Sequence, residues 1–218
     1  MGAEDAAARD RRRMVAHQLR ARGIRDERVL EAMAEIPRER FVGPAYRTRA
    51  YADEAVPIDE GQTISQPYMV AQMTELLAVA PGDRILELGT GSGYQAAVLA
   101  RLGAHVISIE RHPDLAAAAT ERLEALGLGD RVEIRVADGS LGDRSEAPYD
   151  GIIVTAATPA IPTELRDQLA DGGRLVIPVG PRSHQVLMRA VRQGDDWVDT
   201  PHGGCVFVPL IGPGGFPD

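Results

Sequence analysis

The glycine-rich segment 86–94, Leu-Glu-Leu-Gly-Thr-Gly-Ser-Gly-Tyr, constrains the fold of this chain more than any other feature. It completes a short apolar run, 84–88, that predicts a buried strand, and it leads into a predicted helix that reaches about Leu102. Glycines at such a junction allow the backbone to turn sharply and to approach a ligand closely. We therefore expect a ligand site at the end of this strand.

Strands and helices continue to alternate after this turn. Repeated strand–helix units predict a parallel, doubly wound α/β sheet. Near the C-terminus two strands follow one another without a clear helix between them, which predicts an antiparallel end to the sheet. The predicted strands are 84–88, 105–110, 132–137, 150–155, 173–179, 185–192 and 205–210, and the later predicted helices are 113–126 and 162–170.

The first part of the chain predicts a helical cap. Residues 6–22 predict one helix, Asp26 is suited to N-cap a second helix that Pro37 ends, and a third helix begins near Pro67. We expect a single domain, 1–218, in which 1–62 form the N-terminal helical cap and substrate loop and 63–218 form a Rossmann-like core.

Composition narrows the function by exclusion. The chain has no lysine, so that all 24 basic residues are arginine, which excludes a Schiff-base lysine, a pyridoxal-phosphate site and a P-loop lysine. Its one cysteine, Cys205, excludes an internal disulfide and a cysteine-cluster metal site, and the histidines show no metal-binding spacing. We expect no metal, and the net charge of -8 argues against nucleic-acid binding.

The sequence also predicts where the protein works. No apolar run approaches the roughly 18 residues that a membrane span needs. The charged N-terminal segment 1–13 is followed by no apolar stretch of the kind found in a secretion signal. We therefore expect a cytoplasmic monomer that does not bind a membrane.

Two acidic positions at the ends of predicted strands extend the ligand site. Glu110 ends the second strand, 21 residues after Gly89, where a carboxylate can accept hydrogen bonds from a ribose diol. Asp138-Gly139 follows the third strand. The glycines depart from the Gly-x-Gly-x-x-Gly pattern of dinucleotide sites, because Tyr94 stands at its third position. The spacing instead resembles motif I of class I methyltransferases, which implies S-adenosyl-L-methionine as the methyl donor.

This resemblance implies a set of donor-binding residues. In such enzymes the acidic residue after the third strand meets the adenine amine. Glu87 lies inside the motif and either contacts the donor or only ties down the loop. The residues assigned to the donor pocket are Thr63, Ile64, Ser65, Glu87, Gly89, Thr90, Gly91, Ser92, Gly93, Tyr94, Glu110, Arg111, Asp138, Gly139 and Thr155.

The segment before the third helix points to the methyl acceptor. Residues 61–71, Gly-Gln-Thr-Ile-Ser-Gln-Pro-Tyr-Met-Val-Ala, closely resemble the signature of protein-L-isoaspartate O-methyltransferases. The similarity covers nearly the whole chain, from Gln18-Leu19 and Pro37-Arg38 to the run Phe-Val-Pro-Leu at 207–210. A DNA amino-methylating enzyme is disfavoured, because Thr-Ala-Ala-Thr-Pro at 155–159 replaces the Asn/Asp-Pro-Pro-aromatic motif of those enzymes.

The resemblance implies methyl transfer to the free α-carboxylate of L-isoaspartyl residues in damaged proteins and peptides, with the β-carboxylate of D-aspartyl residues as a second acceptor to consider. A carboxylate with a pKa of about 4 is ionised at pH 7, so no general base is required and positioning dominates. Ser65 is the candidate catalytic residue, expected to hold this carboxylate through its hydroxyl. The alternative is that Ser65 caps the helix that begins near Pro67.

The same resemblance implies that Pro57, Ile58, Thr63, Val206 and Val208 line the groove for the peptide. The chain departs from its relatives at two positions. Val206 stands where related chains often carry Arg, which puts some contacts with the peptide backbone or carboxylate in doubt. Ser140 stands where bacterial relatives often carry Trp, which alters the expected wall of the adenine pocket.

Two other functions stay open at this point. A tailoring enzyme that methylates a normal aspartate in a natural-product precursor would have a similar active site. Such enzymes usually carry extra sequence, whereas this chain stops eight residues after Leu210. A module that binds S-adenosylmethionine and peptides without turnover is the second alternative, and the intact glycine loop and Ser65 argue against it.

Overall fold

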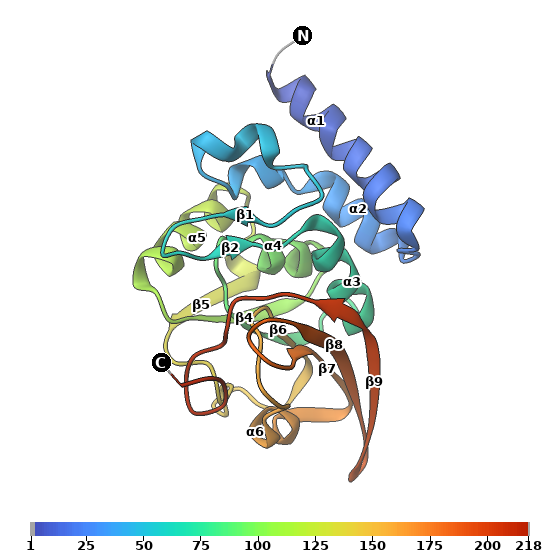
Figure 1. The fold of residues 1–218 in the computed structure, drawn as a ribbon, viewed down its shortest axis with the longest axis vertical. Helices are drawn as coiled ribbons and strands as arrows, with labels where there is room; N and C mark the ends of the chain where they lie inside the picture. Colours follow the sequence, from blue (N-terminus) through green and yellow to red (C-terminus); the bar gives the residue numbers. More distant parts are fainter. Residues whose placement is uncertain (1–2, 218) are drawn as a thin grey trace.

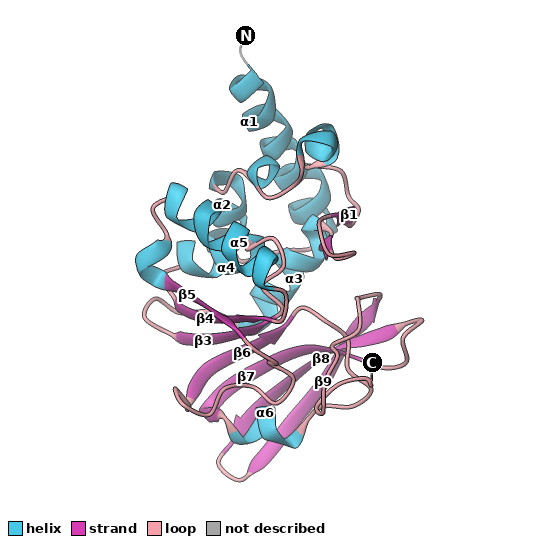
Figure 2. Cartoon of the chain, turned by 90° about the vertical axis from the view of Figure 1, so that its left-hand side faces the viewer, coloured by secondary structure: helices cyan, strands magenta, loops and turns pink. Residues whose placement is uncertain are grey.

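A seven-stranded sheet separates the molecule into two layers (Figure 2). The computed structural model describes residues 3–217. The strand order is β5-β4-β3-β6-β7-β8-β9, and pairing is parallel from β5 to β7 and antiparallel from β7 to β9. The strands are β3 (Arg84–Leu88), β4 (His105–Glu110), β5 (Val132–Val136), β6 (Tyr149–Val154), β7 (Leu169–Val179), β8 (Gln185–Gln193) and β9 (Asp196–Cys205). The predicted parallel sheet with an antiparallel end is confirmed.

Helices cover the two faces of the sheet unequally (Figures 1 and 2). On one face lie α3 (Pro67–Leu77), α4 (Tyr94–Arg101) and α5 (Pro113–Ala125), whereas the short α6 (Thr163–Asp167) lies on the other. Side chains alternate between the faces of each strand. Ile85 therefore joins the core beneath α3 and α4, while Leu86 and Leu88 join the core beneath α6.

The N-terminal cap packs on top of the helix-covered face (Figure 1). Helix α1 (Ala3–Met14) continues through a π turn, Val15–Leu19, and a 3₁₀ turn, Arg20–Arg22, to Gly23, whose φ of 101° ends it. Helix α2 (Glu27–Glu35) follows. Its predicted N-cap is confirmed, because the Asp26 carboxylate accepts a hydrogen bond from the Arg28 amide at 2.9 Å.

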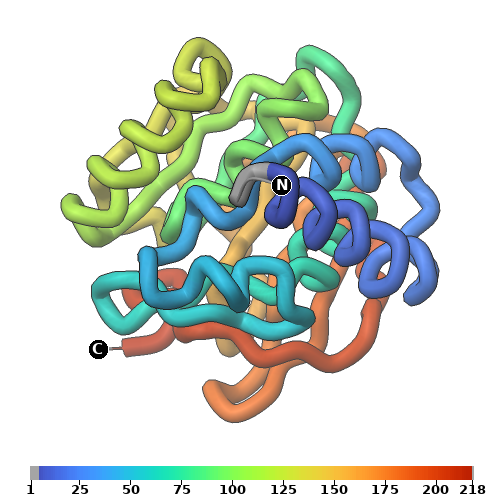
Figure 3. The backbone as a smooth tube through the Cα atoms, turned by 90° about the horizontal axis from the view of Figure 1, so that it is seen from above, coloured from blue at the N-terminus to red at the C-terminus, as the bar shows by residue number. Residues whose placement is uncertain are grey.

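A two-stranded hairpin links the cap to the core. After 3₁₀ turns at Arg38–Arg40 and Pro44–Arg49, β1 (Val56–Pro57) pairs with β2 (Thr63–Ile64). The cap boundary that the sequence places after residue 62 runs through this hairpin. Seen from above, the hairpin and the C-terminal segment run side by side (Figure 3). Residues of both segments line one cavity, described below.

Two predicted elements near the C-terminus are wrong in extent. The last strand is β9, 196–205, and not 205–210, because β9 is an exposed sheet edge whose polar sequence hides the strand pattern. The apolar run 206–210 instead crosses the strand ends: the Ala157 amide donates to the Val208 carbonyl and the Leu210 amide to the Ala157 carbonyl, both at 2.8 Å. The predicted helix 162–170 is also too long, because Leu169 already pairs with Tyr149 in the sheet.

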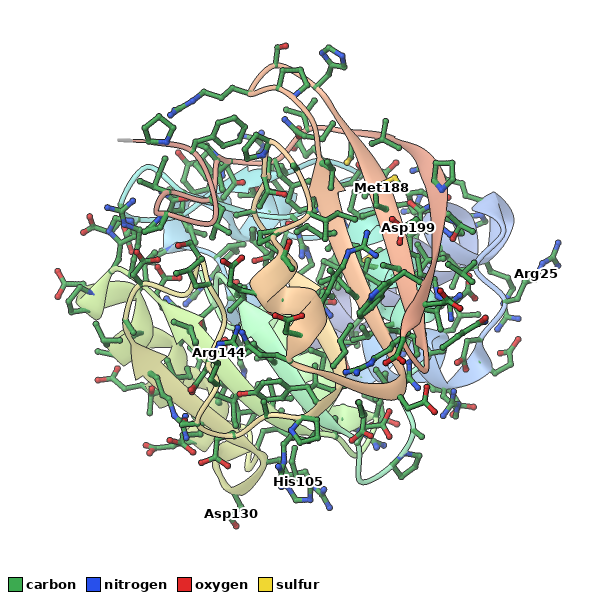
Figure 4. The ribbon with its side chains drawn as sticks, turned by 90° about the horizontal axis from the view of Figure 1, so that it is seen from below. Arg25, His105, Asp130, Arg144, Met188 and Asp199 are labelled. Atoms are coloured by element: carbon green, nitrogen blue, oxygen red, sulfur yellow. The ribbon has the colours of Figure 1, made fainter. Side chains whose placement is uncertain are left out.

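Charged side chains lie on the surface of the molecule. In the view from below, the labelled Arg25 and Asp130 project outward from its rim (Figure 4). No helix within 3–217 is both long and apolar enough to cross a membrane. Nor do these residues contain a group of three or more His, Cys, Asp or Glu placed to hold a metal ion.

Candidate active site

The glycine-rich turn follows β3, the strand at which the order of strands in the sheet changes direction. From β3 the chain adds β4 and β5 on one side, and β6 to β9 lie on the other. The carboxyl ends of β3 and β6 therefore form the crevice in which open α/β sheets bind ligands. At this point Thr155, just after β6, ties the two strands together, because its Oγ1 donates to the Gly89 carbonyl at 2.6 Å and its amide donates to the Leu88 carbonyl at 3.0 Å.

Gly89 is required at the start of the loop for two reasons. Its φ is 95°, a conformation that side chains disfavour, and a Cβ placed there would lie 2.6 Å from Thr155 Oγ1. Further along, a Cβ on Gly93 would lie 3.1 Å from Ala119 of α5. The loop is thus pressed between β6 and α5 with no room for side chains at these two glycines.

Glu110 closes the opposite side of the crevice. Its Oε2 accepts a hydrogen bond from the Gly91 amide at 2.8 Å, and its Oε1 accepts one from the His112 amide at 3.0 Å. The side chain is fixed and nearly buried, yet each carboxylate oxygen can accept a second hydrogen bond. This geometry leaves Glu110 able to bind a pair of ligand hydroxyls.

Asp138 and Gly139 lie after β5 on the same edge. A Cβ on Gly139 would approach Ile109 to 3.0 Å, so a side chain at this position would collide with β4. The C-terminal turn packs against the residues after β5: the Gly214 amide donates to Ser140 Oγ at 3.2 Å, and a Cβ on Gly212 would lie 2.4 Å from that oxygen. Ser140 is fully buried there, and its small side chain lets the C-terminal turn pack closely against it.

These walls enclose a cavity of about 560 Å³, which we call the donor cavity. Its volume lies within the range of small-molecule sites, about 300–1,000 Å³. Its lining combines apolar side chains with the carboxylates of Glu110 and Asp138. A ligand that contains a nucleoside needs both, apolar surface for its base and polar groups for its hydroxyls and amine. The donor cavity is lined by Gly61, Gln62, Thr63, Leu88, Gly89, Gly91, Ile109, Glu110, Arg111, His112, Val136, Ala137, Asp138, Gly139, Thr155, Ala156, Val208, Pro209, Leu210, Ile211 and Gly212. The residues fit S-adenosylmethionine.

Glu87 lies beneath the loop and lines neither this cavity nor the smaller one described next. It is fully buried on the helix-covered face, where Ser108 Oγ donates to its Oε2 at 2.5 Å and Thr90 Oγ1 contacts Ser108 Oγ at 2.5 Å. Burial raises the pKa of Glu87 to about 8. Of the two roles that the sequence left open, this geometry supports the tie that holds the loop from below.

Ser65 lies in a second, smaller cavity of about 40 Å³, the acceptor pocket, which shares Thr63, Gly89, Gly91 and Thr155 with the donor cavity. Its lining also includes the predicted residues Ile64, Thr90, Ser92 and Tyr94, together with Val70, Met73 and Gln95. The structure thus brings most of the assigned residues together around two adjoining spaces. Within 3–217, Gly93, like Glu87, lies outside both linings.

Ser65 does not cap the helix that follows it. The N-cap of α3 is Gln66, and no side chain caps the helix there. Within the described part of the chain the Ser65 hydroxyl forms no hydrogen bond with another residue, and the side chain is partly exposed. The hydroxyl is therefore available to a ligand in the acceptor pocket.

The residues assigned to the peptide groove are dispersed. Thr63 and Val208 line the donor cavity, whereas Ile58 lies beside the loop, 3.7 Å from the position of a Cβ on Gly91. Pro57 is exposed on the hairpin, and Val206 is 73% exposed next to the sheet edge. Neither Pro57 nor Val206 lines either cavity among the described residues.

Two further residues lie at the site, and their sequence context predicts no role for either. His112 donates its amide to Glu110, and its Nδ1 lies 3.5 Å from Glu60 Oε2 at the tip of the hairpin. Arg38 donates a hydrogen bond to the Ser65 carbonyl at 2.7 Å. Pro37-Arg38 belonged to the sequence resemblance, but no local pattern reveals a contact made across 27 residues.

Comparisons with known proteins agree with this geometry. The sequence pattern of the family described as protein-L-isoaspartate(D-aspartate) O-methyltransferase matches residues 10–214. The chain is 55% identical over 208 residues to the protein-L-isoaspartate O-methyltransferase of Methanoculleus marisnigri, an alignment that covers 95% of this chain and 94% of the other.

Solved structures agree as well. One described as a protein-L-isoaspartate O-methyltransferase superposes with a TM-score of 0.82 at 29% identity, over 93% of this chain and 66% of that longer chain. A structure from Plasmodium falciparum, described as a beta-aspartate methyltransferase in complex with S-adenosyl-L-homocysteine, has a TM-score of 0.80 at 27% identity and covers 92% of this chain and 98% of that one.

Proposed function

This chain belongs to the protein-L-isoaspartate(D-aspartate) O-methyltransferase family, and we propose that it binds its methyl donor in the donor cavity and its acceptor carboxylate at Ser65. Membership of this family makes the protein an S-adenosylmethionine-dependent protein repair methyltransferase. The observation that carries the assignment of the acceptor is the free hydroxyl of Ser65 in a pocket that adjoins the donor cavity.

On the donor side, the protein binds and orients. When bound, S-adenosylmethionine supplies an electrophilic methyl carbon on a sulfonium. Glu110 accepts hydrogen bonds from the ribose hydroxyls, since both of its oxygens are already aimed by backbone amides. Asp138 is placed to accept from the adenine amine, and the 89–93 loop lets the backbone lie close to the rest of the donor.

On the acceptor side, Ser65 Oγ donates a hydrogen bond to one oxygen of the isoaspartyl α-carboxylate. The other oxygen would then be free to attack the methyl carbon of the donor, and an O–CH₃ bond would form as the S–CH₃ bond breaks and leaves its electron pair on sulfur. The carboxylate is already ionised at neutral pH, so no proton has to be removed. Catalysis then rests on alignment, which can contribute roughly 7–11 kcal/mol.

The product explains why methylation is a repair step. Methylation converts the carboxylate into an ester, whose carbonyl carbon can be attacked because methoxide leaves far more readily than oxide. The neighbouring peptide nitrogen then forms a C–N bond to that carbon as the C–OCH₃ bond breaks, and methanol departs with the proton of the nitrogen, which closes a succinimide ring. Hydrolysis of that ring returns a share of normal aspartyl residues. We extend the proposal to an extended peptide lying along 206–208 beside the hairpin residues Pro57 and Ile58, where the exposed Val206 leaves its backbone open to pairing.

Two peptides that differ in one linkage test the proposal. The enzyme is incubated with S-adenosylmethionine labelled in its methyl group and with an isoaspartyl peptide or its aspartyl twin, and base-labile label is counted. We expect label on the isoaspartyl peptide, with a D-aspartyl peptide as a third acceptor to compare. Label on the aspartyl peptide would instead indicate a tailoring enzyme. Label on none, with measurable donor binding, would indicate a module without turnover.

A further inference from the structure

Arg38 is the largest fully buried side chain near the acceptor pocket. Its Nε donates to the Ala50 carbonyl and its Nη2 donates to the Ser65 carbonyl, both at 2.7 Å. Its guanidinium carbon lies 4.8 Å from the centre of the Tyr94 ring, and Tyr94 is the first residue of α4. One side chain thus joins the cap, the link before α3 and the helix that follows the glycine loop.

This buried cation has no carboxylate partner among the residues that the structure describes. The neighbouring acid, Glu39, accepts a hydrogen bond from Tyr51 instead. Arg38 Nη1 and the Tyr94 hydroxyl are both buried without a well-formed hydrogen bond, and the two groups interact weakly with each other. Burial lowers the pKa of Arg38 to about 10, which leaves the guanidinium charged at neutral pH.

Such an arrangement is unfavourable for folding alone. A buried charge without a counter-charge destabilises a protein, and apolar residues of similar volume can fill the same space with less penalty. The two carbonyl contacts explain how Arg38 is held but not why a charge is kept there. A counter-ion that arrives with the substrate would explain it.

We propose that Arg38 is a positioning residue for the methyl acceptor: it fixes the backbone of Ser65 and places a positive charge behind the acceptor pocket, so that the carboxylate of the substrate is its counter-ion. This inference rests on the proposed function, because an isoaspartyl carboxylate is the anion that enters the pocket. The planar guanidinium suits the task, since it reaches two carbonyls at once with donors in fixed directions.

A double-mutant cycle with Ser65 tests the positioning role. Arg38→Lys keeps the charge but cannot reproduce the two-carbonyl fork, so we expect kcat/KM for the isoaspartyl peptide to fall about 10-fold. The dissociation constant of S-adenosylhomocysteine should stay within about twofold. Because Arg38 acts through Ser65, Arg38→Lys should cause no further loss in a Ser65→Ala background. Losses that multiply, or an unchanged rate in Arg38→Lys, would overturn the proposal.

A binding comparison tests the charge without requiring turnover. With S-adenosylhomocysteine present, the wild type should bind the isoaspartyl peptide about 10-fold more tightly than its neutral isoasparaginyl analogue. Arg38→Lys should keep this preference and Arg38→Met should lose it. A folded Arg38→Met variant with the wild-type preference would contradict the proposal, and if Arg38→Met does not fold, absence of the preference in Arg38→Lys would do so.

Arg174→Met is the matched control. Arg174 is also partly buried and donates to the Leu77 carbonyl and to Asp83, both at 2.8 Å, but it does so at the far end of α3. Its replacement should lower the melting temperature while kcat/KM and the acid-to-amide preference stay within about twofold. A wild type that binds the acid preferentially but transfers no methyl would refute the proposed function, whereas loss of that preference in Arg38→Met would still support the role of the Arg38 charge.

Discussion

The donor cavity and the acceptor pocket lie side by side but are held in opposite ways. Around the donor, each polar group stands at the end of its own strand, and its position follows from the parallel sheet: Gly89 after β3, Glu110 at the end of β4 and Asp138 after β5. Around the acceptor, Ser65 lies on a link between a two-residue strand and a helix, and Arg38 reaches it from the cap.

The two sites obtain their precise geometry from different sources. A site at strand ends inherits its geometry from backbone pairing, whereas a site on a link needs a side chain from elsewhere to fix it. Substitutions at the two places should therefore separate donor binding from methyl transfer.

Gly89→Ala should damage the donor side most. The new methyl group would meet Thr155 Oγ1 at 2.6 Å on a residue with a φ of 95°, so that the loop must move. We expect about a 100-fold loss of affinity for S-adenosylhomocysteine by calorimetry, from strain of about 1–3 kcal/mol together with the lost contact. Gly172→Ala is the control, because Gly172 has a φ of 74° but open space around it. Equal effects in the two variants would refute crowding as the cause.

Ser65→Ala should damage only the acceptor side. Loss of one hydrogen bond to a charged carboxylate, worth about 1.5–3 kcal/mol, predicts a fall in kcat/KM of about 10- to 150-fold. Affinity for S-adenosylhomocysteine should stay within about twofold of the wild type. Ser183→Ala, an exposed serine that lines neither cavity, serves as the control. If donor affinity fell in parallel with the rate, the two sites would not be separable.

Glu87→Gln should change stability rather than chemistry. In the folded protein Glu87 keeps its proton up to about pH 8, whereas in the unfolded chain it releases it near the ordinary pKa of 4.5. Unfolding thus releases a proton between these values, and the stabilising contribution of Glu87 is lost as the pH rises. The free energy of unfolding of the variant should therefore rise relative to that of the wild type by up to about 1.4 kcal/mol per pH unit in this window.

Denaturant unfolding at four pH values from 5 to 8 measures that gain. Glu133→Gln is the control, because a hydrogen bond from Arg135 holds the pKa of Glu133 below its usual range and the variant should show no gain with rising pH. Parallel stability curves for wild type and Glu87→Gln would show that Glu87 is ionised when folded.

Glu60→Gln should have the smallest effect, although it lies where the hairpin meets the donor wall. Its carboxylate is 3.5 Å from His112 Nδ1, and both side chains are partly exposed. Even a fully charged pair at such an exposed site contributes only about 0–1 kcal/mol, so donor affinity should change less than about fivefold. His112→Gln should behave alike, since the His112 amide still donates to Glu110. A loss of donor affinity above tenfold in either variant would show instead that the contact between Glu60 and His112 helps to hold the donor.

The sequence predicted the donor side well because its signals are local. Strands 84–88 and 105–110 have the predicted bounds, and the apolar runs that reveal them are buried on both faces. The glycines at 89 and 93 have a positive φ and closely packed neighbours, and glycine is the residue type that predicts both features in a sequence. Periodicity and turn chemistry therefore sufficed to predict the loop and to place Glu110 and Asp138 at one edge.

The rest depended on contacts between distant segments. Strand β9 was missed because an exposed edge has no apolar alternation, and Pro201 and Gly203 within it suggest a loop. Arg38 was missed because its partners, the carbonyls of Ala50 and Ser65, carry no side-chain signal. Backbone acceptors can be identified only once the fold brings them together.

The most direct test of where the acceptor binds is a crystal structure of the enzyme with S-adenosylhomocysteine and an isoaspartyl peptide. We predict a carboxylate oxygen within hydrogen-bond distance of Ser65 Oγ, about 2.6–3.0 Å, facing the sulfur across the space that the methyl group occupies in the donor. Arg38 should still bind the Ser65 carbonyl. A peptide whose carboxylate lies away from Ser65, with its side chain outside the acceptor pocket, would contradict both the assignment of Ser65 and the role of Arg38.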